Sequence, residues 1–467
     1  MANRAPSASA FTAIIVGGSV AGLTLAHMFS KAHIDYTLLE ARDTISPQLG
    51  ASIVIMPNGA RILDQLGVFE DMRDDFITKM SRSFVRRSDG RLVSWNEWPR
   101  MVEEKLGYPC SICERRRFLG SLYEQLEDKS RILLEKKVVD IKHEKDGVAV
   151  RCQDGSEFRG DLVIGADGIH SRTRVEMQRL AEEMGPKGLM DRDKSSITAE
   201  YNCFFGIADE IPELIPGDSH VSTDIDHSSL LFVSQGSNAV TNARAGGLPQ
   251  WFFFSKMDRK YSGSSIPRFT KAHMDQQVEE FGDFKLTENV TLKEIIKKSR
   301  TLSYLPLEEA SHEVWTFGRI VCLGDAIHKM TPNLGQGGNQ AIESAAVLTN
   351  CLIELLQKTS DNKPELSVLK ESLRQYQTLR QKRAEKFVHL SAMVTRNDAL
   401  ATLKHTVLFL YAEPLSGEAL TAFQTEMYHT APYLNFLPLP RHVTENETWK
   451  QGIERVKAND IIPRPRL

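Results

Sequence analysis

The sequence predicts an α/β (α+β) protein, in which a domain built on a parallel sheet carries a β-meander, is interrupted by a second, sheet-based domain, and is followed by a helical region. Three patterns predict this arrangement. A strand, a helix and a second strand open the chain at 12–39, short strands broken by Asp-Gly turns fill 131–165, and β-rich runs separated by Gly, Asn and Pro occupy 195–310. With 467 residues, 41% of them hydrophobic, the chain is long enough for several domains with a large core.

The N-terminal segment has the pattern of a βαβ unit. The apolar run 11–16 ends on Gly17, helical spacing of apolar residues begins at Val20, and a second strand over 36–39 ends on Glu40. The segment continues from a short Ala/Ser-rich stretch straight into the first strand, which argues against a cleaved targeting peptide.

The turn between the first strand and the helix reads Gly17-Gly18-Ser19-Val20-Ala21-Gly22. Gly17 permits the tight turn and Gly22 the close packing of helix on strand, while Ser19 stands where the GxGxxG pattern has its middle glycine. Glu40 then lies where a carboxylate accepts hydrogen bonds from a ribose diol. The pattern predicts a dinucleotide site and does not distinguish FAD from NAD.

Two distant segments narrow the choice of cofactor. Residues 160–174 (GDLVIGADGIHSRTR) form a buried strand that ends in Asp-Gly, and residues 324–339 (GDAIHKMTPNLGQGGN) form a loop and a helix start after the strand 320–323. Together with the glycine turn, and in the same order, they resemble the motifs of the single-component, aromatic-hydroxylase-like flavoprotein monooxygenases known as group A. The resemblance spans residues 12–396 and implies a Rossmann-like FAD-binding domain.

The resemblance also implies roles for single residues. Glu40 would bind the adenosine ribose, Asp325 the ribityl chain or pyrophosphate, and Asp167 both FAD and NAD(P)H. Arg116 would bind the flavin phosphates, although its neighbours Arg115 and Arg117 remain alternatives. The complete set of expected cofactor-binding residues is Gly17, Gly18, Ser19, Gly22, Glu40, Ala51, Arg116, Asp167, Asp325, Pro332, Gly335, Gly337, Gly338 and Asn339.

The loop at 332–338 has a physical rationale of its own. A reduced flavin is negatively charged, and free N–H groups of successive glycines at a helix N-terminus direct dipoles at that charge without a buried cation. We expect Gly335 and Gly337 at this position and Pro332 near the flavin ring. His328 is expected to be a neutral histidine on the loop surface and not a catalytic one, and Ser171 and Arg174 are expected to support the Asp-Gly turn.

No second strand-GxGxxG-helix pattern follows the first one. This fits an enzyme in which NAD(P)H binds transiently, reduces the flavin and leaves, and O2 then supplies one oxygen atom. The expected domains are an FAD-binding domain at 1–80, 105–180 and 310–357, a substrate-binding sheet domain at 81–104 and 181–309, and a C-terminal helical region at 358–467.

Composition excludes several other classes of protein. The net charge of −3 without a long basic block leaves no electrostatic footprint for nucleic acid. No stretch approaches the roughly 18 to 20 apolar residues of a membrane span, so we expect a cytoplasmic protein. The few scattered cysteines indicate a reducing compartment and, apart from one CxxC, lack metal-ligand spacing; they are Cys110, Cys113, Cys152, Cys203, Cys322 and Cys351.

The segments 50–53 (GASI) and 57–67 (PNGARILDQLG), with 324–333, resemble a fungal secondary-metabolite branch of the family. That branch epoxidises the prenyl chains of meroterpenoids and indole diterpenes, or the indole double bond of prenylated indole alkaloids, whose epoxides rearrange to spiro-oxindoles. We expect indole 2,3-epoxidation, with prenyl-chain epoxidation and phenol or salicylate hydroxylation as alternatives. A flavin-dependent reductase of isoprenoid double bonds and a non-enzymatic FAD-fold binding protein are further alternatives.

Two positions depart from the pattern of this branch. Asn202 stands where an Arg often follows the Tyr, Gln48 lies where an acid is common, and both are expected to face the substrate. We therefore consider Tyr201 and Arg192 as candidate catalytic residues. The runs Phe204-Phe205 and 251–254 (WFFF) alternate between the two sides of a strand, so half of their rings are expected to line an apolar substrate pocket.

Overall fold

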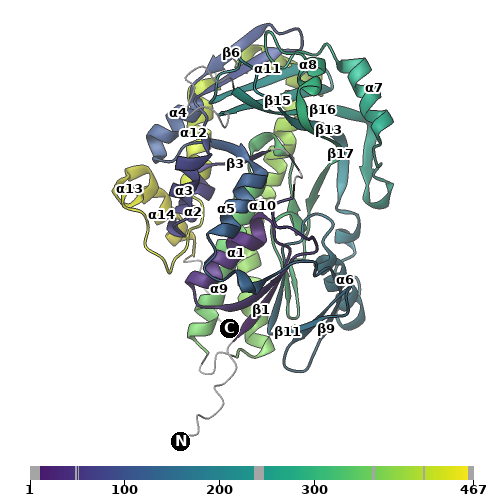
Figure 1. Ribbon diagram of the computed structural model, residues 1–467. Coiled ribbons are helices and arrows are strands. Elements are labelled where there is room, and N and C mark those ends of the chain that lie inside the picture. Colours follow the sequence, from purple (N-terminus) through teal and green to yellow (C-terminus); the bar gives the residue numbers. More distant parts are fainter. Residues whose placement is uncertain are drawn as a thin grey trace, which may run out of the picture.

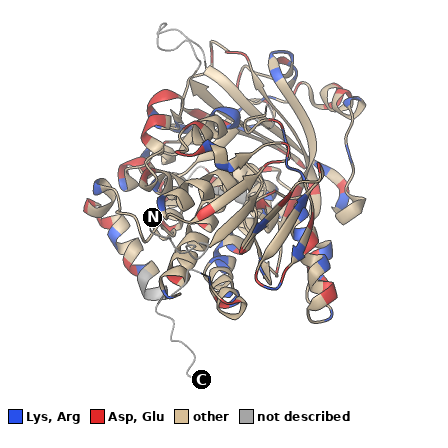
Figure 2. Cartoon of the chain, turned by 60° about the horizontal axis from the view of Figure 1, so that its bottom comes forward, with Lys and Arg blue, Asp and Glu red and all other residues tan. Residues whose placement is uncertain are grey.

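The computed structural model describes residues 11–47, 50, 52–235, 247–359, 363–413 and 416–460. Figure 1 shows a parallel sheet with its helices in the lower part of the molecule, a large sheet across the top, and the C-terminal helices packed along one side. Acidic and basic side chains are interspersed along the elements that Figure 2 displays.

The lower part is built on a six-stranded sheet in the order β18-β19-β12-β1-β2-β8. Its strands are β1 (Thr12–Val16), β2 (Asp35–Leu39), β8 (Ile132–Leu133), β12 (Leu162–Gly165), β18 (Thr316–Phe317) and β19 (Ile320–Cys322). All neighbours are parallel except β18, which pairs antiparallel with β19. The loops after β1, β2, β12 and β19 therefore meet at one edge of the sheet, where α/β proteins bind their ligands.

Helices and a meander cover the two faces of this sheet. Figure 1 shows α1 and α9 on one side, and α6 with β9 and β11 on the other. The bounds are α1 (Val20–Lys31), α6 (Arg172–Met184), α9 (Gly337–Gln357), β9 (Val138–His143), β10 (Val148–Cys152) and β11 (Glu157–Gly160). The sheet is buried on both faces, which explains why β1 and β12 are continuous apolar runs.

The upper part is an eight-stranded sheet in the order β20-β17-β13-β16-β15-β14-β5-β6. Its strands are β5 (Arg82–Arg87), β6 (Leu92–Asn96), β13 (Thr198–Ala208), β14 (Asp218–Asp224), β15 (His227–Gln235), β16 (Gly247–Ser262), β17 (Ser299–Ser311) and β20 (His328–Lys329). α7 (Lys271–Phe281) and α8 (Leu292–Lys297) supply Met274, Val278 and Ile295 to the apolar cluster on one face. The face opposite these helices is called the inner face below.

A small sheet connects the two parts of the molecule. It consists of β3 (Ser52–Ile55), β7 (Ser111–Glu114) and β4 (Thr78–Lys79), in the order β3-β7-β4. The helices of this region are α2 (Pro57–Gln65), α3 (Phe69–Asp75), α4 (Trp98–Leu106) and α5 (Arg115–Glu124). The long helix α10 (Leu366–Asp398) packs on α9 and reaches the upper sheet with its C-terminal end.

The C-terminal helical region contains α11 (Leu403–Ala412), α12 (Ser416–His429), α13 (Arg441–Glu445) and α14 (Glu447–Asp460). α12 packs against α2 and α4, α14 packs against α4 and α12, and α11 contacts α10. Trp449 donates its indole N–H to the carbonyl oxygen of Leu106 at 2.7 Å, and Arg61 donates to the carbonyl oxygen of Ala431 at 2.6 Å. Among the helices that the structure describes, none is long and apolar enough to span a bilayer.

Candidate cofactor and substrate site

The glycine turn after β1 is tightly packed. Gly17 has a positive φ of 106°, and a Cβ there would lie 2.6 Å from the carbonyl oxygen of Ala166. A Cβ at Gly22 would lie 1.9 Å from the carbonyl oxygen of Gly17. Only glycine fits these two positions, because the turn, the helix and the strand β12 approach one another so closely.

Glu40 is fixed at the end of β2. The backbone N–H of Gly18 donates to Oε2 of Glu40 at 2.6 Å, and the N–H of Arg42 donates to Oε1 at 3.0 Å. The carboxylate thus lies beside the glycine turn, at the edge of the sheet where a dinucleotide's ribose is bound in this type of fold.

Of the three consecutive arginines, the structure brings Arg115 to the glycine turn. Its Nη2 donates to Oγ of Ser19 at 2.7 Å. Burial lowers the pKa of Arg115, and the neighbouring Asp325 opposes that shift. Arg116 is exposed, and Arg117 is exposed and forms an ion pair with Asp75 at 3.2 Å. Of the three arginines, Arg115 is the one in contact with the glycine turn, so we propose Arg115 in place of Arg116 for the phosphate-binding role that the resemblance implies.

The Asp-Gly turn after β12 is held as expected. Oδ1 of Asp167 accepts from Oγ of Ser171 at 2.5 Å, and Oδ2 accepts from the N–H of Thr173 at 2.9 Å. Arg174 donates to the carbonyl oxygens of Ala326 at 2.7 Å and Ile169 at 2.9 Å. Burial raises the pKa of Asp167, whereas these hydrogen bonds favour its ionised form. Arg174 thereby joins this turn to the loop that contains Asp325.

The helices α1 and α9 begin side by side. A Cβ at Gly324 would lie 3.2 Å from the Cβ of Ala341 in α9 and 3.4 Å from that of Ala21 in α1. In the described part of the chain, no side chain caps the first turn of either helix. Two sets of free N–H groups with their helix dipoles therefore point to the same edge of the sheet, which suits the pyrophosphate and the ring of FAD.

The glycine loop that opens α9 leaves room for a ligand. A Cβ at Gly337 would have no described heavy atom within 4 Å, whereas one at Gly335, with φ +62°, would lie 3.0 Å from Val54. Asn339 donates to the carbonyl oxygens of Val54 at 2.9 Å and Gly335 at 2.7 Å. Asn339 therefore holds the loop against β3, and no described residue fills the space that Gly337 faces.

The loop's other predicted members lie in the same region. A Cβ at Gly338 would lie 2.8 Å from Ile53 and 3.9 Å from Val20. Pro332 opens the short turn η5 (Pro332–Leu334), and Asp325 forms an ion pair with Lys329 at 2.6 Å. Ala51 and Gln48 lie outside the described residues. These residues fit FAD, since they combine helix N-termini, a ribose-binding carboxylate and an open glycine.

The surface position predicted for His328 is wrong. Its side chain is 1% exposed, and Nε2 lies 2.8 Å from Oγ of Ser344. Burial lowers the pKa of His328 to about 4, so the ring is neutral near pH 7. The chain folds β20 back under α10 and buries this side chain, which local sequence does not reveal.

Sequence reasoning missed a buried charge cluster behind the glycine loop. Glu343 of α9 is completely buried and forms ion pairs with Arg380 at 3.1 Å and Arg383 at 2.7 Å. Asn58 donates to Glu343 at 2.7 Å and to Gln336, the residue before Gly337, at 3.0 Å. The cluster joins α2, α9 and α10 next to the loop. Glu343 lies on a different helix from Arg380 and Arg383, so these residues form no motif that can be recognised in the sequence.

The aromatic side chains of β13 and β16 lie alternately on the two faces of the upper sheet, as predicted. Phe204, Trp251 and Phe253 belong to the core beneath α7 and α8. The inner face carries a separate apolar cluster of Cys203, Phe205, Val221, Leu230, Phe232, Phe252, Phe254 and Leu307. Phe232 also packs against the core of the lower part. Half of the rings thus face the part of the molecule that carries the cofactor motifs.

The two candidate catalytic residues lie in different surroundings. Tyr201 is 2% exposed and follows strand alternation to the inner face, where Arg396 of α10 lies 5.9 Å from the centre of its ring. Arg192 is exposed and forms an ion pair with Glu313 at 3.1 Å, so we omit it from the site. Asn202 alternates to the side of Phe204, away from the inner face, so its expected contact with substrate is not supported.

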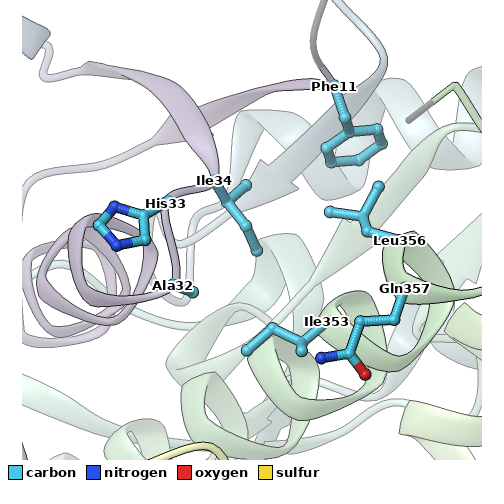
Figure 3. Close-up of a pocket in the computed structure, with 7 residues that line it drawn as sticks. All are labelled: Phe11, Ala32, His33, Ile34, Ile353, Leu356 and Gln357. Atoms are coloured by element: carbon cyan, nitrogen blue, oxygen red, sulfur yellow. The ribbon is translucent and has the colours of Figure 1, made fainter. Parts of the chain in front are cut away.

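A shallow pocket lies away from this site. Figure 3 shows Phe11, the turn 32–34 between α1 and β2, and the end of α9 at Ile353, Leu356 and Gln357 around it. These residues lie at the start of the parallel strands, opposite the edge that carries the cofactor motifs. Over the described ranges, no cluster of side chains has the composition of a metal site.

Comparisons with known proteins agree with this geometry. A family described as an FAD binding domain matches residues 10–391. The FAD-dependent monooxygenase spyC of Aspergillus fumigatus is 40% identical over 445 residues, which cover 95% of this chain and 91% of that protein. The FAD-dependent monooxygenase ausM of Penicillium brasilianum is 39% identical and covers 92% and 88%.

Solved structures share the fold. Klebsiella pneumoniae HpxO complexed with FAD and uric acid has a TM-score of 0.70 at 20% identity, covering 90% of this chain and 97% of that one. A salicylate hydroxylase substrate complex has a TM-score of 0.64 at 20% identity, covering 90% and 98%. With the glycine turn, Glu40 and the two helix N-termini placed at one edge, the chain belongs to the FAD-binding-domain family and is an FAD-dependent monooxygenase.

Proposed function

We propose that this enzyme transfers one oxygen atom from O2 to an electron-rich C=C bond of an apolar fungal metabolite. The first candidate bond is the indole 2,3 double bond of a prenylated indole alkaloid, whose epoxide rearranges to a spiro-oxindole. The observation that carries the proposal is the inner face, where apolar and aromatic side chains face the part of the chain that holds FAD.

The rings on the inner face favour a flat substrate. Phe252 and Phe254 have their ring centres 6.3 Å apart and planes that differ by 2°, and Phe205 lies 5.7 Å from Phe252 at 26°. A row of nearly parallel rings offers stacking surface to an indole, which prefers an offset arrangement. A prenyl chain would also bind to this apolar surface, but it has no ring that could stack on the phenylalanines.

The apolar surface of the inner face favours a neutral, apolar substrate. Burial raises the pKa of its Cys203, so this thiol is neutral near pH 7 and does not serve as a base. A phenol gains reactivity when a base removes its proton, whereas an electron-rich alkene or indole needs no deprotonation and therefore suits this surface.

The protein's contribution is binding, orientation and exclusion of water. When bound, FAD supplies the activation of O2 after reduction by NAD(P)H. The N-termini of α1 and α9, Arg115 and Glu40 hold the cofactor at the sheet edge, and the N–H groups of the glycine loop stabilise negative charge there. The inner face orients the substrate and keeps water away from the reacting atoms.

The experiment is a comparison of substrates by coupled NADPH oxidation. The purified holoenzyme is mixed with prenylated indoles, prenylated non-indole compounds and simple phenols, and NADPH consumption is compared with product formed. The proposal predicts that prenylated indoles stimulate NADPH oxidation and that one molecule of oxygenated product forms for each NADPH consumed. Stimulation by phenols, with hydroxylated product, would contradict it; stimulation by prenyl compounds without an indole would replace the first candidate with the prenyl alkene.

A further inference from the structure

The C-terminal end of α10 is attached to the loop that follows Asp325. Asp398 is the last residue of α10, and its Oδ2 accepts a hydrogen bond from Nδ2 of Asn333 at 2.9 Å. Asn333 directly follows Pro332, which we place near the flavin ring. The carboxyl group of Asp398 is therefore hydrogen-bonded to a side chain of the loop that we place beside the cofactor.

Further contacts make this attachment rigid. Oγ1 of Thr395, one turn earlier in α10, lies 2.7 Å from Oδ1 of Asn333 and 2.8 Å from Oγ1 of Thr331. Both ends of the Asn333 amide are therefore held by the same helix. On the other side, the carbonyl oxygen of Ala399 accepts from the N–H of Asp226 at 2.7 Å, which joins the helix end to the turn between β14 and β15.

The basic side chains near Asp398 form ion pairs with other carboxylates. Arg396 forms ion pairs with Glu200 at 2.7 Å and Glu309 at 3.2 Å. Lys256 of β16 forms an ion pair with Asp226 at 2.9 Å. In the described part of the chain, the Asp398 carboxyl accepts the hydrogen bond from Asn333 and forms no ion pair with a basic side chain.

We propose that Asp398 is a positioning residue for the oxygen-transfer reaction, which holds the Pro332 loop against the end of α10 through the amide of Asn333. The inference depends on the proposed placement of the flavin beside Pro332 and is independent of the substrate. It also assigns a purpose to the long helix: α10 connects the loop beside the cofactor to the sheet that carries the inner face.

The charge of this carboxyl group changes near neutral pH. Asp398 is half-buried, and its partial desolvation raises its pKa to about 7, with Asn333 opposing the shift and Glu413 at the end of α11 adding to it. The position at a helix C-terminus acts in the same direction, because the negative end of the helix dipole disfavours a carboxylate. Above pH 7 the loop therefore has a negative charge beside it, and below pH 7 it does not.

Two substitutions separate the charge from the hydrogen bond. Asp398→Asn keeps an oxygen that accepts from Asn333 but has no charge, whereas Asp398→Ala removes both. Glu385→Gln, an acid-to-amide change on the exposed face of the same helix, is the matched control. The visible absorption spectrum of bound FAD is recorded between pH 5.5 and 9, together with kcat and FAD affinity.

The proposal predicts a spectral transition with a midpoint near pH 7 in the unmodified holoenzyme and in Glu385→Gln, and none in Asp398→Asn. Asp398→Ala is expected to shift the spectrum at all pH values and to lower kcat about tenfold with KM unchanged, because the loop loses its fixed position. An Asp398→Asn enzyme that keeps the transition, or an Asp398→Ala enzyme with an unchanged spectrum and kcat, would overturn the proposal.

A variant of the glycine loop shows which part of the proposal is wrong if it fails, the role of Asp398 or the placement of the flavin beside the loop. Gly337→Ala changes the glycine loop without touching Asp398. If this variant shifts the flavin spectrum while both Asp398 variants do not, the cofactor lies at the loop and the role of Asp398 is wrong. If neither changes the spectrum, the placement of the flavin beside the loop is wrong.

Discussion

Arg115 donates a hydrogen bond of 2.7 Å to the hydroxyl of Ser19, the residue that stands in the middle of the glycine turn. The contact joins the start of α5 to the start of α1, across the position where a pyrophosphate would lie. It also gives Ser19 a role at the position where the GxGxxG pattern has a glycine, because its hydroxyl fixes a cation that would face the phosphates of bound FAD.

This contact predicts different effects for two neighbouring arginines. Arg115→Ala should weaken FAD binding about 10- to 100-fold, since a charge-assisted hydrogen bond contributes roughly 1.5 to 3 kcal/mol. Arg116→Ala, at an exposed position, should change it less than about threefold. Reconstitution of apoprotein, followed by flavin fluorescence, measures both. A larger loss for Arg116→Ala would restore the assignment that the sequence favoured.

Gly337 and Gly22 should respond differently to alanine. At Gly337 a methyl group meets no described atom, so the apoprotein should keep its Tm, while FAD affinity should fall at least about tenfold as the methyl occupies the ligand's space. At Gly22 the methyl would lie 1.9 Å from a backbone oxygen, so the apoprotein itself should be destabilised. Thermal unfolding and FAD titration of both variants give the comparison. Equal effects on Tm would contradict the open space at Gly337.

Adjacent phenylalanines of β16 should separate substrate binding from stability. Phe253→Ala removes a completely buried ring beneath α7 and α8 and should lower the free energy of unfolding by about 3 to 5 kcal/mol. Phe252→Ala, on the inner face, should raise KM for the substrate with a smaller loss of stability. Denaturant unfolding and steady-state kinetics measure the two effects. The assignment of faces would be refuted if Phe253→Ala raised KM and Phe252→Ala did not.

Glu343 should make the stability of the protein depend on pH. Burial alone would raise its pKa, but Arg383 and Arg380 outweigh burial and lower the pKa to about 2. The stabilising contribution is therefore present above the usual pKa of 4.5 and is lost as the pH falls toward 2. Glu343→Gln, which leaves the arginines without their partner, should cost about 3 to 5 kcal/mol at pH 7.

Urea unfolding of both proteins at pH 7 and pH 3 tests this expectation. The difference between them should shrink at pH 3, because the unmodified protein then loses part of the same interaction. Asp154→Asn, which removes an exposed ion pair with Lys136, serves as the control and should change stability by less than about 1 kcal/mol. A constant difference at both pH values would count against Glu343 as the source.

The sequence predicts the elements whose pattern is local. Residues 12–16 are confirmed as β1, the meander and β12 lie within 131–165, and the helix start predicted within 324–339 is the start of α9 at Gly337. The glycine turn, Glu40 and the Asp-Gly turn were recognisable because each requires particular residues in consecutive positions.

The remaining features depend on contacts between distant segments. The choice among three consecutive arginines is made by the start of α5, whose first residue faces Ser19. The burial of His328 and the cluster around Glu343 depend on how α10 packs on α9. The C-terminal helices pack through single long-range contacts such as Trp449 with Leu106. None of these contacts leaves a periodic pattern in the chain.

Isotope labelling decides whether the enzyme transfers one oxygen atom from O2 to a C=C bond of its substrate. The holoenzyme is supplied with NADPH, 18O2 and a prenylated indole, and the product is analysed by mass spectrometry. The product is expected to contain a single 18O atom, located on the former indole double bond. Oxidation of NADPH with an unlabelled product, or a label confined to an aromatic hydroxyl group, would contradict it.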